Sequence, residues 1–116
     1  MDAYIRVGIG VLILQNGRLL LGHRVCSAAD TGGIYEPDSW CLPGGKQEYG
    51  ETILEDAVRE TKEETNLDIK DLQVYCAVDA LQPGKHYVTI QVIARACSGT
   101  LLVLEPEKQD VWKRFP

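Results

Sequence analysis

Residues 44–69 read GGKQEYGETILEDAVRETKEETNLDI, a stretch in which two adjacent glycines precede a long helical pattern. These 26 residues contain eight carboxylates, most of them inside the segment that the pattern predicts to be a helix. Like charges three or four residues apart on a helix repel one another, at a cost of roughly 0.2–0.5 kcal/mol per pair. The gathering of carboxylates therefore needs a physical reason.

The ends of this helix are marked by side chains that satisfy free backbone groups. Thr52 followed by Glu55 fits a capping box, so we expect the helix to begin at Glu51 or Thr52. Asn66 tolerates the left-handed conformation that is common just past a helix C-terminus, so we expect the helix to stop there.

Two arcs of the helix differ in character. At about 100° per residue one arc is expected to face the core, and it holds Ile53, Leu54, Ala57, Val58, Thr61 and Thr65. Glu60, Glu63 and Glu64 project from another arc with no cation between them. Mg²⁺ or Mn²⁺ prefers carboxylate oxygens and would relieve the repulsion. For the helix taken alone, a solvated acidic face is the simpler alternative.

The glycines before the helix favour the metal interpretation. Gly44 and Gly45 allow backbone conformations that other residues avoid, and they let main-chain groups approach a ligand closely. They precede a helix N-terminus, whose free N–H groups suit anions such as phosphate. A glycine loop and a carboxylate helix together indicate phosphate chemistry assisted by a divalent cation.

Taken together, the loop and the helix resemble the motif of the Nudix hydrolase family, G-x5-E-x7-R-E-U-x-E-E-x-G-U, in which U is apolar. The positions that match in register are Gly45, Glu51, Arg59, Glu60, Glu63, Glu64 and Leu67. Two positions depart from the motif, because Thr61 stands at an apolar position and Asn66 at a glycine position. The neighbouring WCLPGG and VTIQVIA segments look most like the MutT-like subgroup, so the resemblance covers most of the chain.

The resemblance implies an α+β fold, a Nudix-type α/β/α sandwich with a mixed β-sheet that carries the catalytic loop and helix. It also implies one domain over residues 1–116. Because the family pattern usually has a helix after the last strand and this sequence ends at EKQDVWKRFP, a truncated C-terminus is one expectation.

The activity implied by the resemblance is hydrolysis of a nucleoside diphosphate derivative, in which water attacks phosphorus with the help of Mg²⁺ or Mn²⁺. Glu60, Glu63 and Glu64 are the expected metal ligands, and the carbonyl oxygen of Gly45 is a further one. Such a cation would neutralise the phosphate oxygens and lower the pKa of its own bound water.

The expected catalytic residues are Glu51, Arg59, Glu60 and Glu63. Arg59 is expected to orient the carboxylates through charge-assisted hydrogen bonds. Glu51 could brace the loop or bind a second metal through water. The general base stays open among Glu51, Glu60, Glu63 and the later Glu105.

Four residues outside the motif are candidates for substrate binding: Arg24, Trp40, Tyr87 and Glu105. Arg24 could reach a phosphate, and the rings of Trp40 and Tyr87 could stack on a base. Glu105 could supply a further acidic ligand. The alternatives are a solvated strand end for Arg24 and ordinary packing for both aromatic residues.

The rest of the chain predicts strands around this helix. YIRVGIGVLIL and LLLGHR flank Asn16-Gly17, a strong signal for a hairpin turn. LQVYCAVDA and HYVTIQVIARA, joined by LQPGK, read as two more strands, and TLLVLE as a further candidate. Residues 25–39 read as a long loop that could help to select the base.

Composition narrows the partners and the location. The net charge of −5 opposes attraction to a nucleic-acid backbone, so we expect no nucleic-acid polymer as partner. No apolar run approaches the roughly 20 residues that a membrane span needs. The four cysteines lack zinc-ligand spacing and predict reduced thiols in a cytoplasmic protein. A nucleotide substrate is expected, and a homodimer is one assembly that the sequence allows.

The preferred substrate is a (d)NTP, cleaved to (d)NMP and pyrophosphate. ADP-ribose or another nucleotide sugar is the alternative, since relatives with that activity often carry a proline about fifteen residues beyond the motif, near Pro83. A turn explains Pro83 as well. A nucleotide-sensing module without activity is a further alternative, although such modules tend to have lost helix carboxylates that this chain keeps. An mRNA-decapping role would favour a basic groove, which an acidic chain with a net charge of −5 does not suggest.

Overall fold

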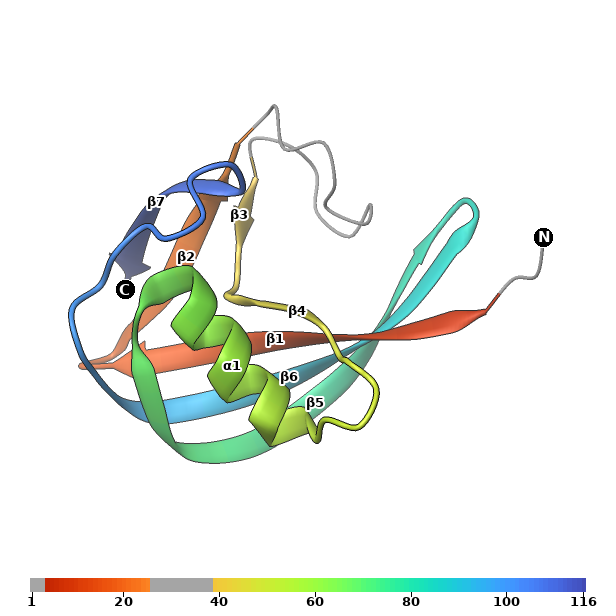
Figure 1. Ribbon diagram of the computed structural model, residues 1–116, viewed down its shortest axis with the longest axis horizontal. Coiled ribbons are helices and arrows are strands. Elements are labelled where there is room, and N and C mark those ends of the chain that lie inside the picture. The colour runs from red at the N-terminus through yellow and green to blue at the C-terminus, as the bar shows by residue number, and fades with distance from the viewer. Residues whose placement is uncertain (1–3, 26–38) are drawn as a thin grey trace.

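The computed structural model describes residues 4–25 and 39–116. The elements are β1 (Ile5–Gln15), β2 (Arg18–Arg24), β3 (Trp40–Cys41), β4 (Gly44–Lys46), α1 (Ile53–Thr65), β5 (Asp68–Gln82), β6 (Lys85–Ser98) and β7 (Gln109–Phe115) (Figure 1). The predicted loop over residues 25–39 lies almost wholly outside the described residues, so its part in base selection stays a prediction.

The N-terminal hairpin of β1 and β2 confirms the turn signal in the sequence. Asn16 and Gly17 have φ values of 54° and 73°. A two-residue type I′ turn requires positive φ at both of these positions. Across the turn, Leu14 pairs with Leu19 in antiparallel register.

The sheet is mixed, as predicted, and strand β1 lies at its centre. The strand order is β3-β2-β1-β6-β5, with β4 also paired to β1 and β7 to β2. β1 runs parallel to β6 and antiparallel to β4. The pairing of β4 with β1 holds the glycine loop against the middle of the sheet (Figure 1).

Strands β5 and β6 confirm two predicted strands, and both are longer than expected. They form an antiparallel hairpin whose turn, Pro83-Gly84, lies inside the predicted LQPGK connection. Gly84 has φ of 77°, a value that favours glycine.

The prediction of a strand at TLLVLE, residues 100–105, is wrong, because the last strand is β7. The backbone N–H groups of Leu102 and Leu104 donate to carbonyl oxygens of Thr65 and Glu64 at the end of α1. A helix C-terminus leaves such carbonyls without partners inside the helix. The segment therefore satisfies the end of α1 instead of pairing in the sheet.

Helix α1 has the predicted caps. Thr52 Oγ1 accepts a hydrogen bond of 3.1 Å from the Glu55 N–H, and Glu55 Oε1 accepts one of 2.9 Å from the Thr52 N–H. Asn66 follows the helix with φ of 68°, in the left-handed region. Thr52 is thus the N-cap, and the first helical residue is Ile53 instead of the expected Glu51 or Thr52.

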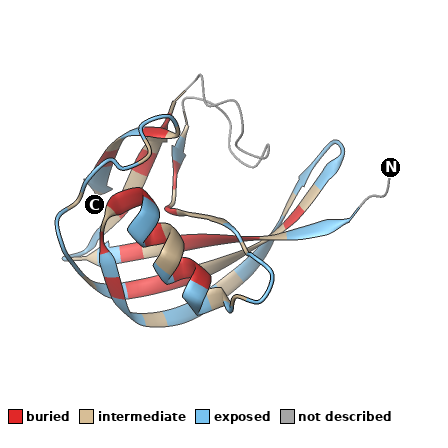
Figure 2. Ribbon diagram, viewed as in Figure 1, coloured by how far each residue is buried: buried red, intermediate tan, exposed pale blue. Residues whose placement is uncertain are grey.

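The predicted core-facing arc of α1 is correct only in part. Ala57, Thr61 and Thr65 are buried, but Leu54 and Val58 are 39% and 40% exposed. Buried and exposed positions are therefore interleaved along the helix (Figure 2). The helix meets the sheet through a narrow row of small side chains, which brings the buried carboxyl groups next to that row close to the sheet.

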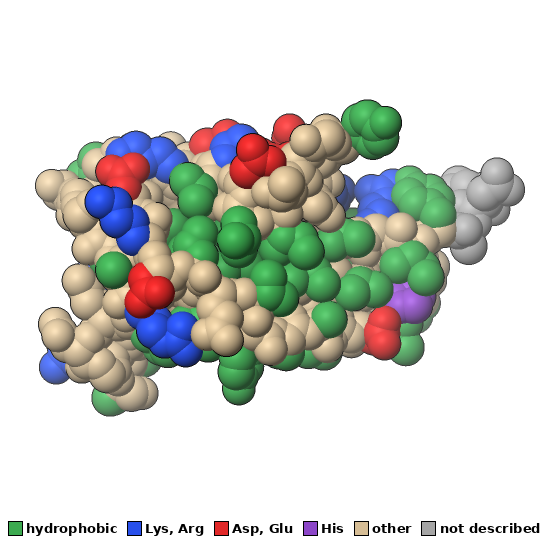
Figure 3. Space-filling model, turned by 90° about the horizontal axis from the view of Figure 1, so that it is seen from below, with side chains coloured by type: hydrophobic (Ala, Val, Ile, Leu, Met, Phe, Trp, Pro, Cys, Tyr) green, Lys and Arg blue, Asp and Glu red, His purple; other side chains and the backbone are tan. Residues whose placement is uncertain are grey.

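The main core lies between α1 and the sheet. It joins Val11, Val92, Ala57 and Leu67, each at most 1% exposed, with other aliphatic residues of the same faces. Burying such an aliphatic side chain stabilises the fold by roughly 1.5–3 kcal/mol. A second apolar area covers the middle of the face shown in Figure 3. Within the described residues, the one helix is neither long nor apolar enough to cross a membrane.

Candidate active site

Strand β4 brings the two glycines into close contact with β1 and α1, for different reasons. A Cβ on Gly44, whose φ is 150°, would lie 1.9 Å from the Ile9 carbonyl oxygen. A Cβ on Gly45 would lie 2.8 Å from the carboxyl atoms of Glu60. Gly44 is therefore required by the backbone packing, whereas Gly45 leaves the space that the Glu60 side chain occupies.

Two carboxyl groups of α1 face this loop, one from a buried position and one from a partly buried position. Glu64 is 2% exposed, and its Oε1 accepts a hydrogen bond of 3.3 Å from the Gly44 N–H. Burial, together with the charge of Glu60, raises the pKa of Glu64 well above its usual value. Burial also raises the pKa of Glu60, against the opposing charge of Arg59. Negative charge on this pair is costly unless a cation lies close by.

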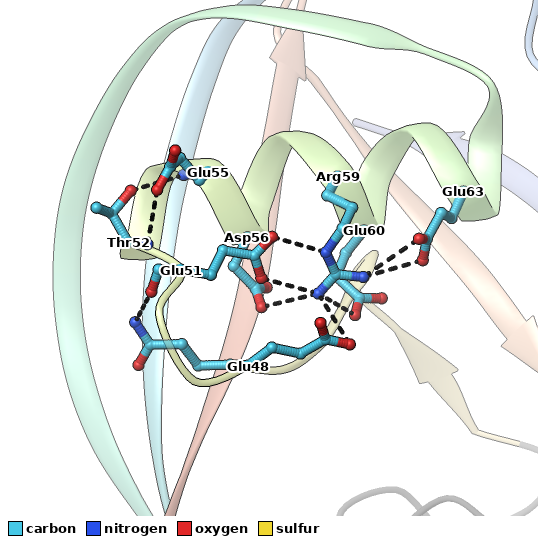
Figure 4. A network of polar contacts seen from close by, with 9 residues as sticks. Glu48, Glu51, Thr52, Glu55, Asp56, Arg59, Glu60 and Glu63 are labelled. Carbon is cyan, nitrogen blue, oxygen red and sulfur yellow. Dashed lines mark hydrogen bonds and ion pairs between the residues drawn. The ribbon is translucent and has the colours of Figure 1, made fainter.

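Arg59 is the centre of a network of carboxylates that come from α1 and from the loop before it (Figure 4). Its guanidinium contacts five of them, those of Glu48, Glu51, Asp56, Glu60 and Glu63. Hydrogen bonds from Arg59 lower the pKa of Glu51. Nη1 lies 3.1 Å and 3.3 Å from the two oxygens of Glu63, so the predicted metal ligand Glu63 is turned toward Arg59.

Asp56 belongs to the same network, although no predicted role falls on it. Its side chain is fully buried, and Oδ2 accepts a hydrogen bond of 3.2 Å from Arg59 Nη2. No donor of the described residues reaches Oδ1. Burial and the adjacent Glu51 carboxyl group raise the pKa of Asp56 to about 7. The available signal was its spacing, four residues before Glu60 on the same helical stripe.

Glu105 reaches this region from the segment between β6 and β7. The pKa of Glu64 is raised mainly by burial and by the charge of Glu60, and the charge of Glu105 adds a smaller contribution. Lys108 Nζ lies 3.3 Å from Glu105 Oε1. The segment is held here because the Leu104 N–H donates to the Glu64 carbonyl oxygen. The structure thus brings Glu105, as well as the helix carboxylates, near the glycine loop.

The other three predicted substrate residues occupy packed positions. Arg24 is only 6% exposed and lies beside the Cys41 thiol, whose pKa is raised by burial despite the nearby guanidinium. The Trp40 ring lies 5.1 Å from His23 and 5.0 Å from Phe115, measured between centroids. Tyr87 is 4% exposed. Arg24 and Tyr87 therefore show little surface for a ligand, whereas Trp40 is 40% exposed, and its role in binding stays a prediction.

A groove of about 710 Å³ opens between the first residues of β1 and the loop that leads into α1. Its lining includes Arg6, Lys46, Tyr49 and Glu51. The volume falls within the roughly 300–1,000 Å³ of small-molecule sites. In the described part of the chain, neither Arg6 nor Lys46 forms an ion pair with a carboxylate. The Arg6 guanidinium lies 4.6 Å from the centroid of the Tyr4 ring, which also lines the groove. The groove therefore contains two cationic side chains and has one end at the Arg59 network.

The donors around the glycine loop suit a hard divalent cation. Carboxylates and a backbone carbonyl are the ligands that Mg²⁺ and Mn²⁺ prefer, and the buried carboxyl pair has raised pKa values that a cation would reverse. Across residues 4–25 and 39–116, however, no three His, Cys, Asp or Glu side chains converge into a ready-made metal site. Glu63, one of the expected ligands, is paired with Arg59.

The comparison with known families and proteins agrees with the motif. A family model described as the NUDIX domain matches residues 4–116. Nudix hydrolase 5 from Arabidopsis thaliana is 33% identical over 78 residues, which are 66% of this chain and 24% of that protein. The chain thus spans about a quarter of the length of this curated relative.

Two solved structures extend the likeness to the whole fold. A MutT NUDIX hydrolase from Burkholderia pseudomallei is 32% identical, with a TM-score of 0.85 over 97% of this chain and 83% of that chain. A protein described as an ADP compounds hydrolase is 22% identical, with a TM-score of 0.74 over 96% of this chain and 57% of that chain. The second likeness concerns the fold alone.

Proposed function

The chain belongs to the Nudix family, and from this premise we propose that it is a hydrolase that cleaves a phosphoric anhydride bond of a nucleoside diphosphate derivative. The observation that carries the proposal is the contact of the glycine loop with the buried carboxyl group of Glu64 and the partly buried one of Glu60. Glu60 fills the space left by Gly45, and Glu64 accepts a hydrogen bond from Gly44. Loop and helix, which match the family motif, thus form one continuous surface.

The proposed cofactor is Mg²⁺ or Mn²⁺. Glu60, Glu63 and Glu64 would hold it together with the carbonyl oxygen of Gly45, and Glu105, whose charge acts on Glu64, is a further candidate ligand. When bound, the cation would neutralise phosphate oxygens and lower the pKa of a coordinated water. Glu63 has a half-exposed side chain, so it can exchange Arg59 for another partner without unfolding the helix.

The remaining charged residues have separate roles in the proposal. Glu51 and Arg59 form a close pair that fixes the loop relative to the helix. The proton of the attacking water passes to one of Glu51, Glu60, Glu63 or Glu105, as the motif already implied. Of these, Glu51 has a pKa lowered by its hydrogen bond with Arg59, so its carboxyl group is ionised at neutral pH.

The proposed substrate is a (d)NTP, which would yield (d)NMP and pyrophosphate. The support is that a MutT hydrolase is both more identical in sequence and higher in TM-score than the ADP compounds hydrolase. We assign the groove beside Glu51 to part of the substrate, because Arg6 and Lys46 can approach phosphate oxygens there. The net charge of −5 supports a small nucleotide over a nucleic-acid polymer.

The test is a hydrolysis screen with Mg²⁺ and with Mn²⁺, in which both products are identified by mass spectrometry. Substrates would be normal, oxidised and methylated dNTPs, ADP-ribose, nucleotide sugars and dinucleoside polyphosphates. Release of NMP and pyrophosphate from a dNTP is the expected result. Faster turnover of ADP-ribose, with AMP as a product, would instead support the alternative of a nucleotide-sugar hydrolase.

A nucleotide-sensing module is the non-enzymatic alternative. It differs from the proposal in a single measurable respect, since it binds a nucleotide and releases no product. Calorimetric titration with each nucleotide, run beside the screen, separates the two. The retained carboxylates Glu60, Glu63 and Glu64 favour the enzyme.

We further place this activity in the cytoplasm, where nucleotides and reduced thiols are found. The described cysteines, Cys41, Cys76 and Cys97, carry free thiols. Whether the active species is a monomer or a homodimer is decided by light scattering of the purified protein.

A further inference from the structure

Asp56 is a buried carboxyl group that the proposed reaction does not use. It lies on the inner side of α1 and is 0% exposed. Charged side chains are buried in this way only when a partner compensates them. Its partner is Arg59, whose Nη2 lies 3.2 Å from Asp56 Oδ2.

Arg59 stands between two sets of carboxylates. On one side it contacts Glu51 and Asp56, neither of which is a proposed metal ligand. On the other it contacts Glu60, 3.2 Å from Nη2, and Glu63, 3.1 Å from Nη1. Arg59 therefore competes with any cation for Glu60 and Glu63. The strength of its contacts with these two carboxylates depends on how strongly Glu51 and Asp56 bind the same guanidinium.

We propose that Asp56 is a positioning residue that shares the Arg59 guanidinium with Glu60, weakens the hold of Arg59 on that carboxylate, and thereby sets the affinity of the site for a divalent cation. This inference rests on the proposed function. Nη2 lies 3.2 Å from both Asp56 Oδ2 and Glu60 Oε1, and 3.0 Å from Glu51 Oε1, which precedes the helix. Without the Asp56 oxygen, Nη2 keeps Glu60 as its near partner on the helix, and a cation must displace a stronger ion pair.

The contact depends on the Asp56 oxygen itself and not on a full negative charge. Oδ2 accepts the hydrogen bond from Nη2 whether or not a proton lies on Oδ1. An asparagine at this position can present its carbonyl oxygen to Nη2 in the same geometry, whereas alanine presents no acceptor. Asp56→Asn and Asp56→Ala therefore separate the hydrogen bond from the charge.

The experiment is a Mn²⁺ titration followed by electron paramagnetic resonance, which needs no substrate and no turnover. The proteins are the wild type, Asp56→Ala, Asp56→Asn and the control Asp68→Asn, whose carboxylate pairs with Lys62 on the surface. We expect Asp56→Ala to raise the Mn²⁺ dissociation constant about tenfold, the lower end for residues that orient metal ligands. Asp56→Asn and Asp68→Asn should stay within about twofold of the wild type.

Each other outcome has a definite reading. Unchanged affinity in Asp56→Ala overturns the inference, and so does an equal loss in Asp56→Ala and Asp56→Asn, because that pattern assigns the effect to charge alone. Absence of Mn²⁺ binding by the wild type contradicts the proposed function instead. If Asp56→Ala does not fold, Asp56→Leu replaces it, since leucine fills the site without a polar atom.

A second readout uses the metal-free protein. The ¹⁵N resonance of Arg59 Nε reports directly on how the guanidinium is held. In Asp56→Ala it should shift and its N–H should exchange faster with water, while Asp56→Asn should resemble the wild type. A signal unaffected by Asp56→Ala would contradict the positioning role even if the Mn²⁺ affinity changed.

Discussion

Arg59 and Glu51 form a two-point contact across the start of α1, with Nε 2.7 Å from Oε2 and Nη2 3.0 Å from Oε1. The two residues are eight positions apart in the chain, and Glu51 precedes the helix. Planar guanidinium and carboxylate groups match in this geometry, which gives both strength and a defined orientation. The contact ties the glycine loop to the carboxylate helix.

The first prediction concerns the stability that this network provides. Arg59→Gln removes the one cation that contacts five carboxylates, so their repulsion is no longer offset. We expect the free energy of unfolding, measured by urea denaturation, to fall by about 2 kcal/mol. Lys62→Gln is the control, because Lys62 has an exposed pair with Asp68 and should cost less than about 0.5 kcal/mol. Equal losses would contradict the network's importance.

The two glycines should respond differently to alanine. Gly45→Ala places a methyl group where the Glu60 carboxyl group lies, and a flexible side chain can move away. The fold should persist while the rate of hydrolysis falls at least about tenfold. Gly44→Ala meets the Ile9 backbone, which cannot yield, so thermal unfolding should show a strongly destabilised protein. Normal stability of Gly44→Ala would show that the β1–β4 contact is looser than described.

The capping box gives a prediction about stability without a change in the site. Thr52→Ala removes the acceptor of the Glu55 N–H and should lower the free energy of unfolding by about 1 kcal/mol. Glu55→Gln is its matched control, since glutamine also accepts a hydrogen bond at this position. The temperature midpoints of both variants decide the matter, and identical midpoints would argue against the cap.

The groove predicts an effect on substrate binding. Arg6→Gln and Lys46→Gln should each raise KM for the nucleotide about tenfold or more, since a charged hydrogen bond contributes about 1.5–3 kcal/mol. Lys85→Gln, in the β5–β6 hairpin, removes the same charge outside the groove lining and should leave KM unchanged. Steady-state kinetics of the three variants tests this, and equal KM values throughout would place the substrate elsewhere.

Much of the fold could be predicted because local signals carried it. Asn16-Gly17, the Thr52 and Glu55 capping box and the left-handed Asn66 each act within a few residues of the chain. The exposure of Leu54 and Val58 could not be predicted, because a helical wheel does not say how wide the contact with the sheet is. TLLVLE is apolar enough for a strand. Its hydrogen bonds to the end of α1 depend on a contact between segments far apart in the chain, which the local pattern does not show.

The candidate site divides in the same way. The motif spacing was sufficient to bring together Gly45, Glu60 and Glu64. Arg59 and Glu63 are four residues apart, a spacing that allows them to pair on the helix, and the structure shows this pair. The motif spacing did not predict that Asp56 would be fully buried. Roles for these residues stay predictions until variants are measured.

The central claim is that the glycine loop and the carboxylate helix hold a divalent cation for hydrolysis. The most direct test compares Mg²⁺-dependent nucleotide hydrolysis by the wild type, Glu63→Gln, Glu64→Gln and Glu55→Gln, a change on the same helix outside the site. We predict that Glu63→Gln and Glu64→Gln each lose most activity while their circular dichroism is unchanged, and that Glu55→Gln keeps it. Full activity in both Glu63→Gln and Glu64→Gln would contradict the account.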